Sequence, residues 1–238
     1  MLILKPTDFQ YFDLKDEWVV WNVGQGQWVT HILGDSCLHY DVGGEIFYAH
    51  ELKPQIQKLC FHRQNKISVS HWDFDHYSLL TSLVKWVPRL CWVDHPTWPS
   101  SEKKSVVTIR NLALPNCGEN PRVMTWRPTS FKNTNESSGV YLDQSVLIPG
   151  DSPTKKEKQW ISHFAHLDRV STLILGHHGS RTSTGDRLLK QLTKLNLAIA
   201  SARFAKYHHP HRQTLQRLQK NKVPVLKTGD WGHIHWQD

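Results

Sequence analysis

The stretch Ser70-His71-Trp72-Asp73-Phe74-Asp75-His76 places four side chains of the metal-ligand type within six residues. Imidazole nitrogens and carboxylate oxygens are the protein ligands of zinc, manganese and iron. Alternation along an extended turn would send His71, Asp73 and Asp75 in one direction, and His76 would open the next element. Without a cation, such a group would stay unsatisfied in a protein core. The stretch therefore predicts a metal site, and a polar turn with an aspartate helix cap is the alternative.

Two further motifs place ligand-type side chains at the ends of expected strands. Leu147-Ile148-Pro149-Gly150-Asp151 puts the Asp151 carboxylate at a strand terminus, where it could bridge two ions; an ordinary Gly-Asp turn is the alternative. In Gly176-His177-His178-Gly179-Ser180, small residues flank two histidines and allow close approach. Adjacent strand residues face opposite ways, so we expect one histidine to bind metal and the other to face the substrate, unless both are ordinary loop histidines.

A third histidine cluster, Tyr207-His208-His209-Pro210-His211, lies in a stretch without acidic residues. One of these imidazoles could act as a general acid or hold a phosphate oxygen. A solvated cluster at a helix start is the alternative.

The positive charge of the chain is concentrated near its C-terminus. The chain has 29 basic and 21 acidic residues, for a net charge of +8. Residues 187–229 hold ten basic and no acidic residues, so the remainder of the chain carries 29 − 10 = 19 basic against 21 acidic residues, or −2. This stretch is either a solvated face or a binding surface for a polyanion such as nucleic acid.

Length and composition indicate one globular domain spanning residues 1–238. Hydrophobic residues make up 39% of the chain, which argues against disorder. No apolar run approaches the roughly 20 residues of a membrane helix, so we expect no membrane insertion. Met1 to Glu17 has no apolar core typical of a secretory signal, which favours the cytoplasm, with an extracytoplasmic location as the alternative. The four cysteines are not in CxxC spacing and are interpreted as reduced core thiols, with two disulfides as the extracytoplasmic alternative.

Hydrophobic patterning predicts strands in the first half and alternating strands and helices in the second. This mixture is typical of sheets covered by helices in one α/β domain. Helices are expected over Glu51–His62, His76–Trp86, Lys155–Leu167, Gly185–Leu195 and Pro210–Lys220. Strands are expected over Trp18–Val23, Trp28–Leu33, Cys37–Val42, Lys66–Ser70, Leu90–Val93, Val123–Arg127, Gly139–Leu142, Ser145–Ile148, Val170–Leu175, Leu197–Ser201 and Pro224–Lys227.

The motifs VGQG, DVGG, HxDxDH, PGD, GHHGS and HHP, in this order from about Trp18 to Trp236, resemble the metallo-β-lactamase-fold domain of the ComEC DNA-uptake proteins. The resemblance implies a four-layer αββα sandwich with a metal site at the mouth between the sheets. It also implies a nuclease that degrades one strand of incoming DNA, and a membrane DNA-uptake channel as a partner. This chain lacks the channel segment, so we expect a stand-alone relative or a separated domain.

The resemblance also implies a role for individual residues. Asp151 matches the bridging carboxylate and Asp41 an acidic residue that supports the site. His178 is the favoured last ligand, with His177 as the alternative, and His209 matches the histidine of the family's YGHP element. The implied ligands of one or two manganese or zinc ions, with magnesium as a further candidate, are His71, Asp73, Asp75, His76, Asp151 and His178.

Three positions depart from the family pattern. Gln27 stands at an acidic position, and Ala205 stands where an asparagine is usual. Residues 133–140 contain no histidine, although the superfamily has its third ligand there. The glutamine at position 27 and the absent histidine are expected either to weaken one metal site or to shift it toward water and carboxylate ligands.

Three functions follow as hypotheses. The first is a metal-dependent phosphodiesterase that cleaves DNA, with single strands as the expected form. Its candidate catalytic residues are Asp75, His177 and His209, and its candidate substrate contacts are Ser180, Lys206 and Arg212, with Trp72 either stacking on a base or packing. The second is a hydrolase of a small ester, lactone or phosphodiester. The third is a non-catalytic DNA-binding module of the competence machinery.

Overall fold

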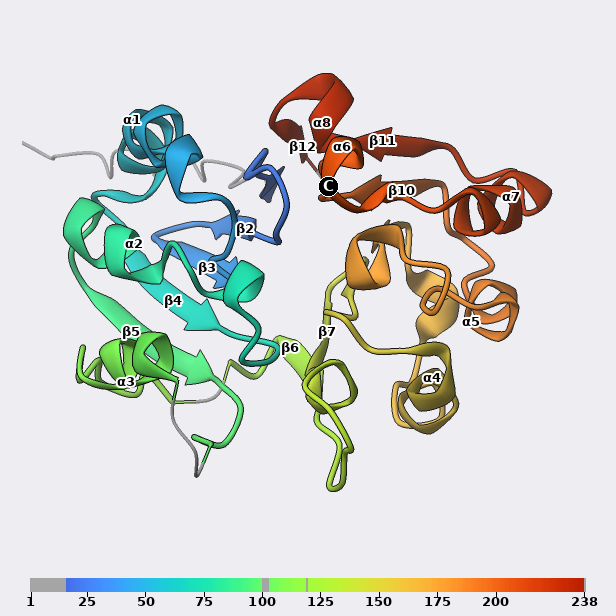
Figure 1. Ribbon diagram of the computed structural model, residues 1–238, viewed down its shortest axis with the longest axis horizontal. Helices are drawn as coiled ribbons and strands as arrows, with labels where there is room; N and C mark the ends of the chain where they lie inside the picture. The colour runs from blue at the N-terminus through green and yellow to red at the C-terminus, as the bar shows by residue number, and fades with distance from the viewer. Residues whose placement is uncertain (1–15, 100–102, 119, 238) are drawn as a thin grey trace, which may run out of the picture.

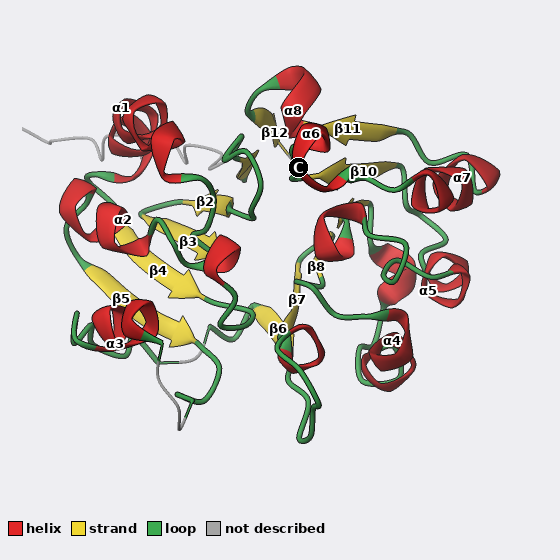
Figure 2. Ribbon diagram, viewed as in Figure 1, coloured by secondary structure: helices red, strands yellow, loops and turns green. Residues whose placement is uncertain are grey.

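Two six-stranded sheets face each other, and helices cover the outer side of each sheet (Figures 1 and 2). The computed structural model describes residues 16–99, 103–118 and 120–237. Three separate clusters of buried apolar side chains lie between the successive layers: helices and first sheet, the two sheets, and second sheet and helices. The expected four-layer αββα sandwich of the metallo-β-lactamase type is therefore confirmed.

The first sheet combines antiparallel and parallel pairs. Its strand order is β12 (Ile234–Gln237), β1 (Glu17–Val20), β2 (Val29–Leu33), β3 (Ser36–Tyr40), β4 (Gln64–Ser68) and β5 (Leu90–Asp94). The β3–β4 and β4–β5 pairs are parallel. Its outer face is covered by α1 (Ala49–Cys60), α2 (Leu80–Trp86) and α3 (Lys104–Arg110). In α1, Leu52, Ile56 and Cys60 recur at helical spacing and form the buried stripe.

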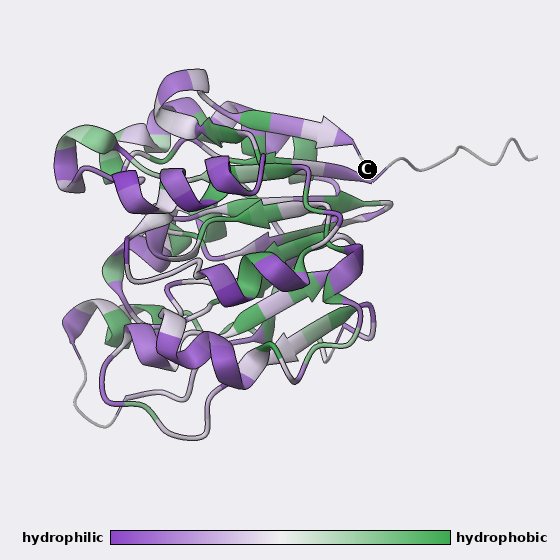
Figure 3. Ribbon diagram, turned by 90° about the vertical axis from the view of Figure 1, so that its right-hand side faces the viewer, coloured by the Kyte–Doolittle hydropathy of each residue, from purple (hydrophilic) through white to green (hydrophobic). Residues whose placement is uncertain are grey.

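The second sheet also combines parallel and antiparallel pairs. Its order is β11 (Val225–Lys227), β10 (Leu197–Ala200), β9 (Thr172–Ile174), β8 (Val146–Ile148), β7 (Val140–Asp143) and β6 (Val123–Trp126). The strands from β8 to β11 are parallel. Its outer face is covered by α4 (Thr154–Trp160), α5 (Asp186–Gln191) and α7 (Arg212–Lys220), whose outward surfaces are hydrophilic (Figure 3). Two short helices, α6 (Phe204–Tyr207) and α8 (Thr228–Trp231), lie at the β11–β12 end.

Strands that are buried on both faces explain the continuous apolar runs of the sequence. In β1, Trp18 and Val20 pack between the two sheets, whereas Val19 packs under the helices. In β8, Val146 and Ile148 face the inter-sheet layer and Leu147 faces the helices. Such double burial is expected for inner strands of a layered α/β protein.

The ligand-bearing motifs all follow the carboxyl ends of parallel strands. The HxDxDH stretch follows β4, Asp151 follows β8, and the paired histidines follow β9. Because the carboxyl ends of parallel strands meet at the same edge of a sheet, these motifs converge at one mouth of the sandwich.

Several element boundaries differ from expectation, and the short helices α6 and α8 were not predicted. The helix expected from His76 begins only at Leu80, because Phe74–His76 forms a 3-10 turn. The helix expected to run to Leu167 ends at Trp160. The strand Ile234–Gln237 was not predicted, and it pairs antiparallel with β1 at the sheet edge.

The cysteines are paired, so the interpretation as reduced thiols is wrong. Cys37 is bonded to Cys60, and Cys91 is bonded to Cys117. The Cα atoms of the two pairs are 5.9 and 5.3 Å apart. This proximity results from the packing of β3 on α1 and of β5 on its neighbouring loop, which the sequence alone does not show. In the part of the chain that the structure describes, no helix has the length and the apolar character needed to cross a membrane. Residues 1–15, on which the localisation argument largely rests, lie outside the described part.

Each disulfide should stabilise the fold by restricting the unfolded chain. For the 23-residue separation of Cys37 and Cys60, the loop-entropy relation gives about 3 kcal/mol. We expect Cys37→Ser/Cys60→Ser to lower the free energy of unfolding in urea by that amount. Alkylation of the denatured, unreduced wild type should label no cysteine. Four labelled cysteines, together with wild-type stability that is indifferent to reductant, would contradict the pairing.

Glu157 should give the fold a specific pH dependence. This α4 residue is buried, and its carboxylate accepts a hydrogen bond from the Gly185 backbone amide. Burial raises the pKa of Glu157 from 4.5 to about 7, so the folded state holds its proton more tightly than the unfolded state. The stabilisation is complete below about pH 4.5 and is lost as the pH rises through 7.

We therefore expect the free energy of unfolding of the wild type, relative to Glu157→Gln, to fall by up to about 3 kcal/mol between pH 4.5 and 8. Urea unfolding across this range, in the presence of chelator, measures the difference. A difference in the free energy of unfolding that is the same at every pH does not affect this test. Parallel profiles for the two proteins would show that Glu157 titrates normally.

Candidate metal centre

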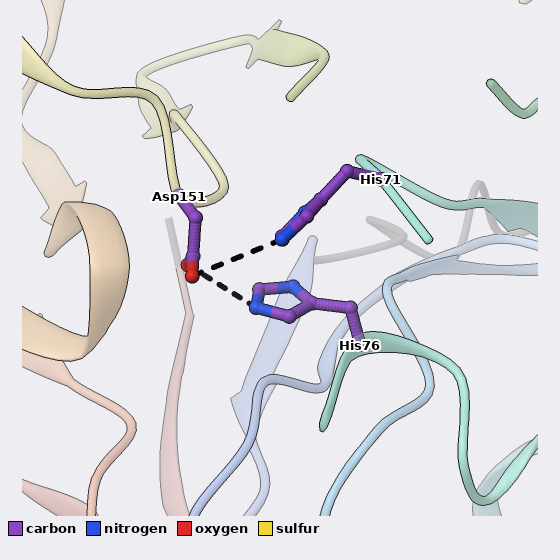
Figure 4. Close-up of side chains that lie close together, drawn as sticks. All are labelled: His71, His76 and Asp151. Carbon is purple, nitrogen blue, oxygen red and sulfur yellow. Dashed lines mark ion pairs between the residues drawn. The ribbon is translucent and has the colours of Figure 1, made fainter. Parts of the chain in front are cut away.

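Five side chains from both halves of the chain converge at the mouth between the sheets. We call His71, Asp75, His76, Asp151 and His178 the His–Asp cluster. Asp151 approaches His71 and His76 from the opposite sheet (Figure 4). Two groups of potential ligand atoms, each lying within 4.8 Å of one another, share His76: His71–His76–Asp151 and Asp75–His76–His178.

The polar atoms of this cluster converge without satisfying one another. His71 Nε2, His76 Nε2, His178 Nε2 and Asp151 Oδ1 are buried and have no hydrogen-bond partner within the described structure. His76 Nε2 lies 3.1 Å from Asp151 Oδ1, and His178 Nε2 lies 3.2 Å from Asp75 Oδ2. Ligands bonded to one ion at 2.0–2.2 Å stand about 3.0–3.6 Å apart, so this spacing fits a shared divalent cation. The donor set also suits such an ion, since it combines imidazole nitrogens and carboxylates.

One buried carboxylate, Asp41, orients the imidazoles of the first group. It accepts hydrogen bonds from His76 Nδ1 at 2.8 Å and from the Ser70 hydroxyl at 2.9 Å. The Ser70 oxygen in turn lies 3.0 Å from His71 Nδ1. When the Nδ1 atom carries the proton, the Nε2 lone pair is left to face the cluster, which is the tautomer that a metal ligand needs.

The paired histidines lie in a left-handed turn, so the expected strand alternation does not apply to them. His177 and His178 have φ values of 50° and 56° in the short turn Gly176–Gly179. His178 Nδ1 donates to the Ser201 carbonyl at 2.9 Å, and its Nε2 joins the cluster. His177 is partly exposed, and its Nε2 lies 3.5 Å from Asp151 Oδ2. Backbone conformations this rare for non-glycine residues are held in place by the surrounding structure.

Charge is strongly coupled within the cluster. Burial alone would lower the pKa of His76, but the Asp151 and Asp41 carboxylates raise it well above its usual value. Burial alone would raise the pKa of Asp151, but the His76 and His178 imidazoles hold it well below its usual range. Without an ion, protons on the imidazoles balance the carboxylates, so metal binding must displace protons.

The departure at Gln27 has a structural role. Its Nε2 atom donates to Asp41 Oδ2 at 2.8 Å, and its backbone amide donates to the Asp75 carbonyl at 3.0 Å. Gly43 lets the same loop approach closely, because a Cβ at this position would overlap the carbonyl group of Asp75. The VGQG and DVGG motifs therefore pack directly against the loop that carries the ligand residues.

Asp73 stands slightly apart from the His–Asp cluster. Its Oδ2 lies 3.4 Å from His71 Nε2, but the same oxygen accepts a hydrogen bond from Thr134 Oγ1 at 2.8 Å. Asp73 belongs to neither of the two ligand groups, whereas the other five residues expected as ligands do.

The cluster opens into a small polar cleft of about 190 Å³, which we call the metal-site cleft. His177 and His209 line it, with ring centroids 6.0 Å apart. Burial, together with the neighbouring His178 and His177 imidazoles, lowers the pKa of His209 to about 4. The remaining lining residues are Gln25, Asp73, Asp75, Asn135, Asp151, His178 and Tyr207.

Sequence reasoning missed Asn135, although it identified its segment as unusual. The amide of Asn135 lies 3.4 Å from the His177 ring, within the segment 133–140 that lacks the superfamily's histidine. A neutral asparagine in a polar loop carries no signal of its own, so only the fold could reveal this position.

The three residues expected to contact the substrate differ in their burial and in their neighbours. Ser180 is buried, and its hydroxyl lies 3.0 Å from the Thr182 hydroxyl. Lys206 lies on α6 beside Tyr207 and is 3.6 Å from Glu45. Arg212 is exposed at the start of α7.

The chain has competence proteins among its homologues. It is 30% identical over 113 residues to ComE operon protein 3 of Bacillus subtilis, covering 46% of this chain and 14% of that protein. It is 26% identical over 238 residues to Recombination protein 2 of Haemophilus influenzae, covering 90% of this chain and 28% of that protein. It is 24% identical over 224 residues to Competence protein ComA of Neisseria gonorrhoeae, covering 88% and 30%. The chain thus spans less than a third of the length of these relatives, and no family model matches it.

Solved structures of low sequence identity share the fold. The metallo-β-lactamase-fold protein YhfI of Bacillus subtilis superposes with a TM-score of 0.57 at 13% identity, over 94% of this chain and all of that one. A diphosphatase of the PhnP family gives 0.54 at 11% identity, over 93% and 98%. The metallo hydrolase Igni18 of Ignicoccus hospitalis gives 0.52 at 10% identity, over 93% and 99%. The chain therefore has the metallo-β-lactamase fold.

Asp151 contributes to the first ligand group and approaches His178 of the second, so its loss should impair metal binding. We expect Asp151→Asn to weaken manganese or zinc binding at least about a hundredfold, since even outer partners of metal ligands are worth ten- to a hundredfold. Titration calorimetry on chelator-stripped protein measures this. Asp230→Asn, which removes an exposed carboxylate on α8, is the matched control and should bind like the wild type. Equal affinity in Asp151→Asn and the wild type would remove Asp151 from the site.

Proposed function

We propose that the protein is a metal-dependent phosphodiesterase that cleaves single-stranded DNA. The observation that carries the proposal is the convergence of three unpaired, buried imidazole Nε2 atoms with the Asp151 and Asp75 carboxylates at the mouth between the sheets. A divalent ion held there would supply Lewis-acid polarisation of a phosphoryl oxygen and an acidified water.

Different residues of the chain would bind the ions and orient the metal ligands. His71, His76 and Asp151 would hold one ion, and Asp75 and His178 would contribute to a second, because the single Nε2 lone pair of His76 can bind only one ion. Asp41 and the Ser201 carbonyl keep these imidazoles in the ligand tautomer. Asp73 is fixed by Thr134 at the edge of the cleft, where a further oxygen ligand would fit.

His177 and His209 are the proposed proton-handling residues. Their imidazoles line the cleft and are not part of either ligand group. With its pKa lowered to about 4, His209 is neutral at neutral pH and offers an N–H donor to a phosphate oxygen. A bound phosphodiester anion would raise that pKa, since negative charge favours the imidazolium, and so let His209 protonate the leaving oxygen.

The surroundings of the cleft support a polyanionic substrate over a small apolar one. Asn135 lines both the metal-site cleft and a neighbouring cavity of about 600 Å³, whose wall includes Arg181 and also Lys155, which is paired with Glu136. Lys206 adjoins Tyr207, which also lines the metal-site cleft. A metal-site cleft of about 190 Å³ is smaller and more polar than the 300–1,000 Å³ apolar pockets that enclose small ligands.

The competence relatives suggest where such cleavage is used. Because these homologues are competence proteins, we propose that the DNA is incoming DNA and that a membrane DNA-uptake channel is the partner. The two disulfides support a location in an oxidising compartment outside the cytoplasm. Four free thiols in protein taken from its native cells would contradict this location.

Basic residues flanking the cleft should hold the DNA backbone. We expect Arg181→Ala/Lys206→Ala to bind a single-stranded oligonucleotide more weakly in chelator, with a slope of log affinity against log salt lower by about one to two. Glu45 stays paired with Arg203 in this variant, so no isolated charge is left. Cleavage of a small phosphodiester in manganese should change little.

Lys53→Ala/Lys58→Ala on the exposed face of α1 is the matched control and should keep the wild-type slope. An unchanged affinity and slope in the cleft variant would favour a small-substrate hydrolase. Binding without cleavage by the manganese-loaded wild type would favour the non-catalytic competence module.

A further inference from the structure

A second cavity, of about 550 Å³, lies beside the metal-site cleft and has mostly aromatic and proline walls. We call it the aromatic cavity. Its apolar walls are formed by Trp72, Trp98, Phe131, Pro96, Pro99 and Pro128. Its size is within the range of ligand sites, and neither the metal ions nor the backbone contacts proposed above use it.

The aromatic cavity and the metal-site cleft share one wall. Trp72 stands between His71 and Asp73 in the sequence and lines the aromatic cavity. Thr134 also lines the aromatic cavity, and its hydroxyl donates to Asp73, which lines the cleft. A substrate whose reacting phosphate lies in the cleft would therefore have its neighbouring group at the aromatic cavity.

The aromatic surfaces of this cavity combine a rigid face with a free one. The Trp98 ring stacks on the Trp72 ring with centroids 4.6 Å apart and an interplanar angle of 17°. The Trp72 indole N–H donates to the Thr97 carbonyl at 3.1 Å, which fixes this pair. Phe131 is 58% exposed, and its ring stacks on no other aromatic ring of the described residues. A free aromatic ring in the same cavity as a fixed pair is suited to a flat ligand.

The charge of the cavity favours a neutral group over a phosphate. Arg127 is its one lining cation among the described residues, and its guanidinium pairs with Asp94 at 2.6 Å. The same guanidinium donates to the Ser70 and Val69 carbonyls and to the Tyr141 hydroxyl. Its charge is balanced and most of its donors are occupied, so it offers little to an anion.

We propose that the aromatic cavity binds one unpaired nucleobase of the nucleotide next to the scissile phosphate. The proposal rests on the phosphodiesterase function and specifies its substrate. Every nucleobase has a π-face, so stacking at Trp98 and Phe131 accepts any base. The Thr134 and Ser137 hydroxyls donate to Asp73 and to the Thr134 carbonyl, so at the wall they can only accept hydrogen bonds from a base. A base-paired nucleotide cannot enter such a cavity, so the cavity selects single strands over duplexes.

The test compares a twelve-residue thymidine oligonucleotide with a base-free oligomer of the same phosphate number, both bound in chelator. The wild type should prefer the base-containing oligomer, and Phe131→Ala should reduce that preference about five- to 150-fold, the effect of one stacked base. Phe131→Trp keeps a stacking ring and should restore the preference. Phe61→Ala, which removes a 41% exposed phenylalanine at the end of α1, is the control and should leave it unchanged.

Manganese affinity should be the same in all variants, because Phe131 lies outside the ligand groups. If the wild type cleaves single strands but Phe131→Ala keeps the full preference for bases, the nucleobase proposal is overturned and the phosphodiesterase function stands. In that case we would infer that the aromatic cavity binds a side chain of a protein partner. If the wild type neither binds nor cuts either oligomer, both proposals fail together.

Discussion

The site depends on one buried carboxylate, Asp41, at the carboxyl end of β3. A buried anion is tolerated only when hydrogen bonds replace its hydration. Asp41 meets this condition through the Ser70 amide and hydroxyl, the Gln27 side chain and His76 Nδ1. These bonds connect the loop before β2, the end of β3 and the ligand loop after β4, and they set the direction in which the imidazoles point.

These hydrogen bonds stabilise the Asp41 carboxylate but leave the Nε2 atoms of the imidazoles without partners. Satisfying the Nδ1 atoms leaves the Nε2 atoms of His71, His76 and His178 facing one another across Asp151. Lone pairs of that number, close together and out of water, favour a bound cation. The fold brings the opposing carboxylate from the other sheet, so metal binding would also hold the two halves of the sandwich together at this mouth (Figure 4).

Much of this could be predicted from the sequence because the ligand types are local. The HxDxDH stretch holds three of the five residues of the His–Asp cluster within one short segment, and the apolar runs of β1 and β8 reveal strands that are buried on both faces. Long-range partners had no local signal. Gln27 looked like a loss at an acidic position, yet it donates to Asp41. The pairing of Cys37 with Cys60 and the position of Asn135 depend on packing across the chain. The aromatic cavity is formed by segments around residues 72, 98 and 131, which are far apart in sequence.

We infer that the His–Asp cluster holds divalent ions at two positions, one beside His71, His76 and Asp151 and one beside Asp75 and His178. Crystals of the manganese-loaded protein, measured at the manganese absorption edge, test it most directly. We expect one anomalous density peak within bonding distance, about 2.0–2.3 Å, of His76 Nε2, with His71 and Asp151 as further ligands, and a second peak beside Asp75 and His178. Partial loading would show at least one of these peaks. A well-ordered structure with manganese in the crystal but no anomalous density at the cluster would contradict the account.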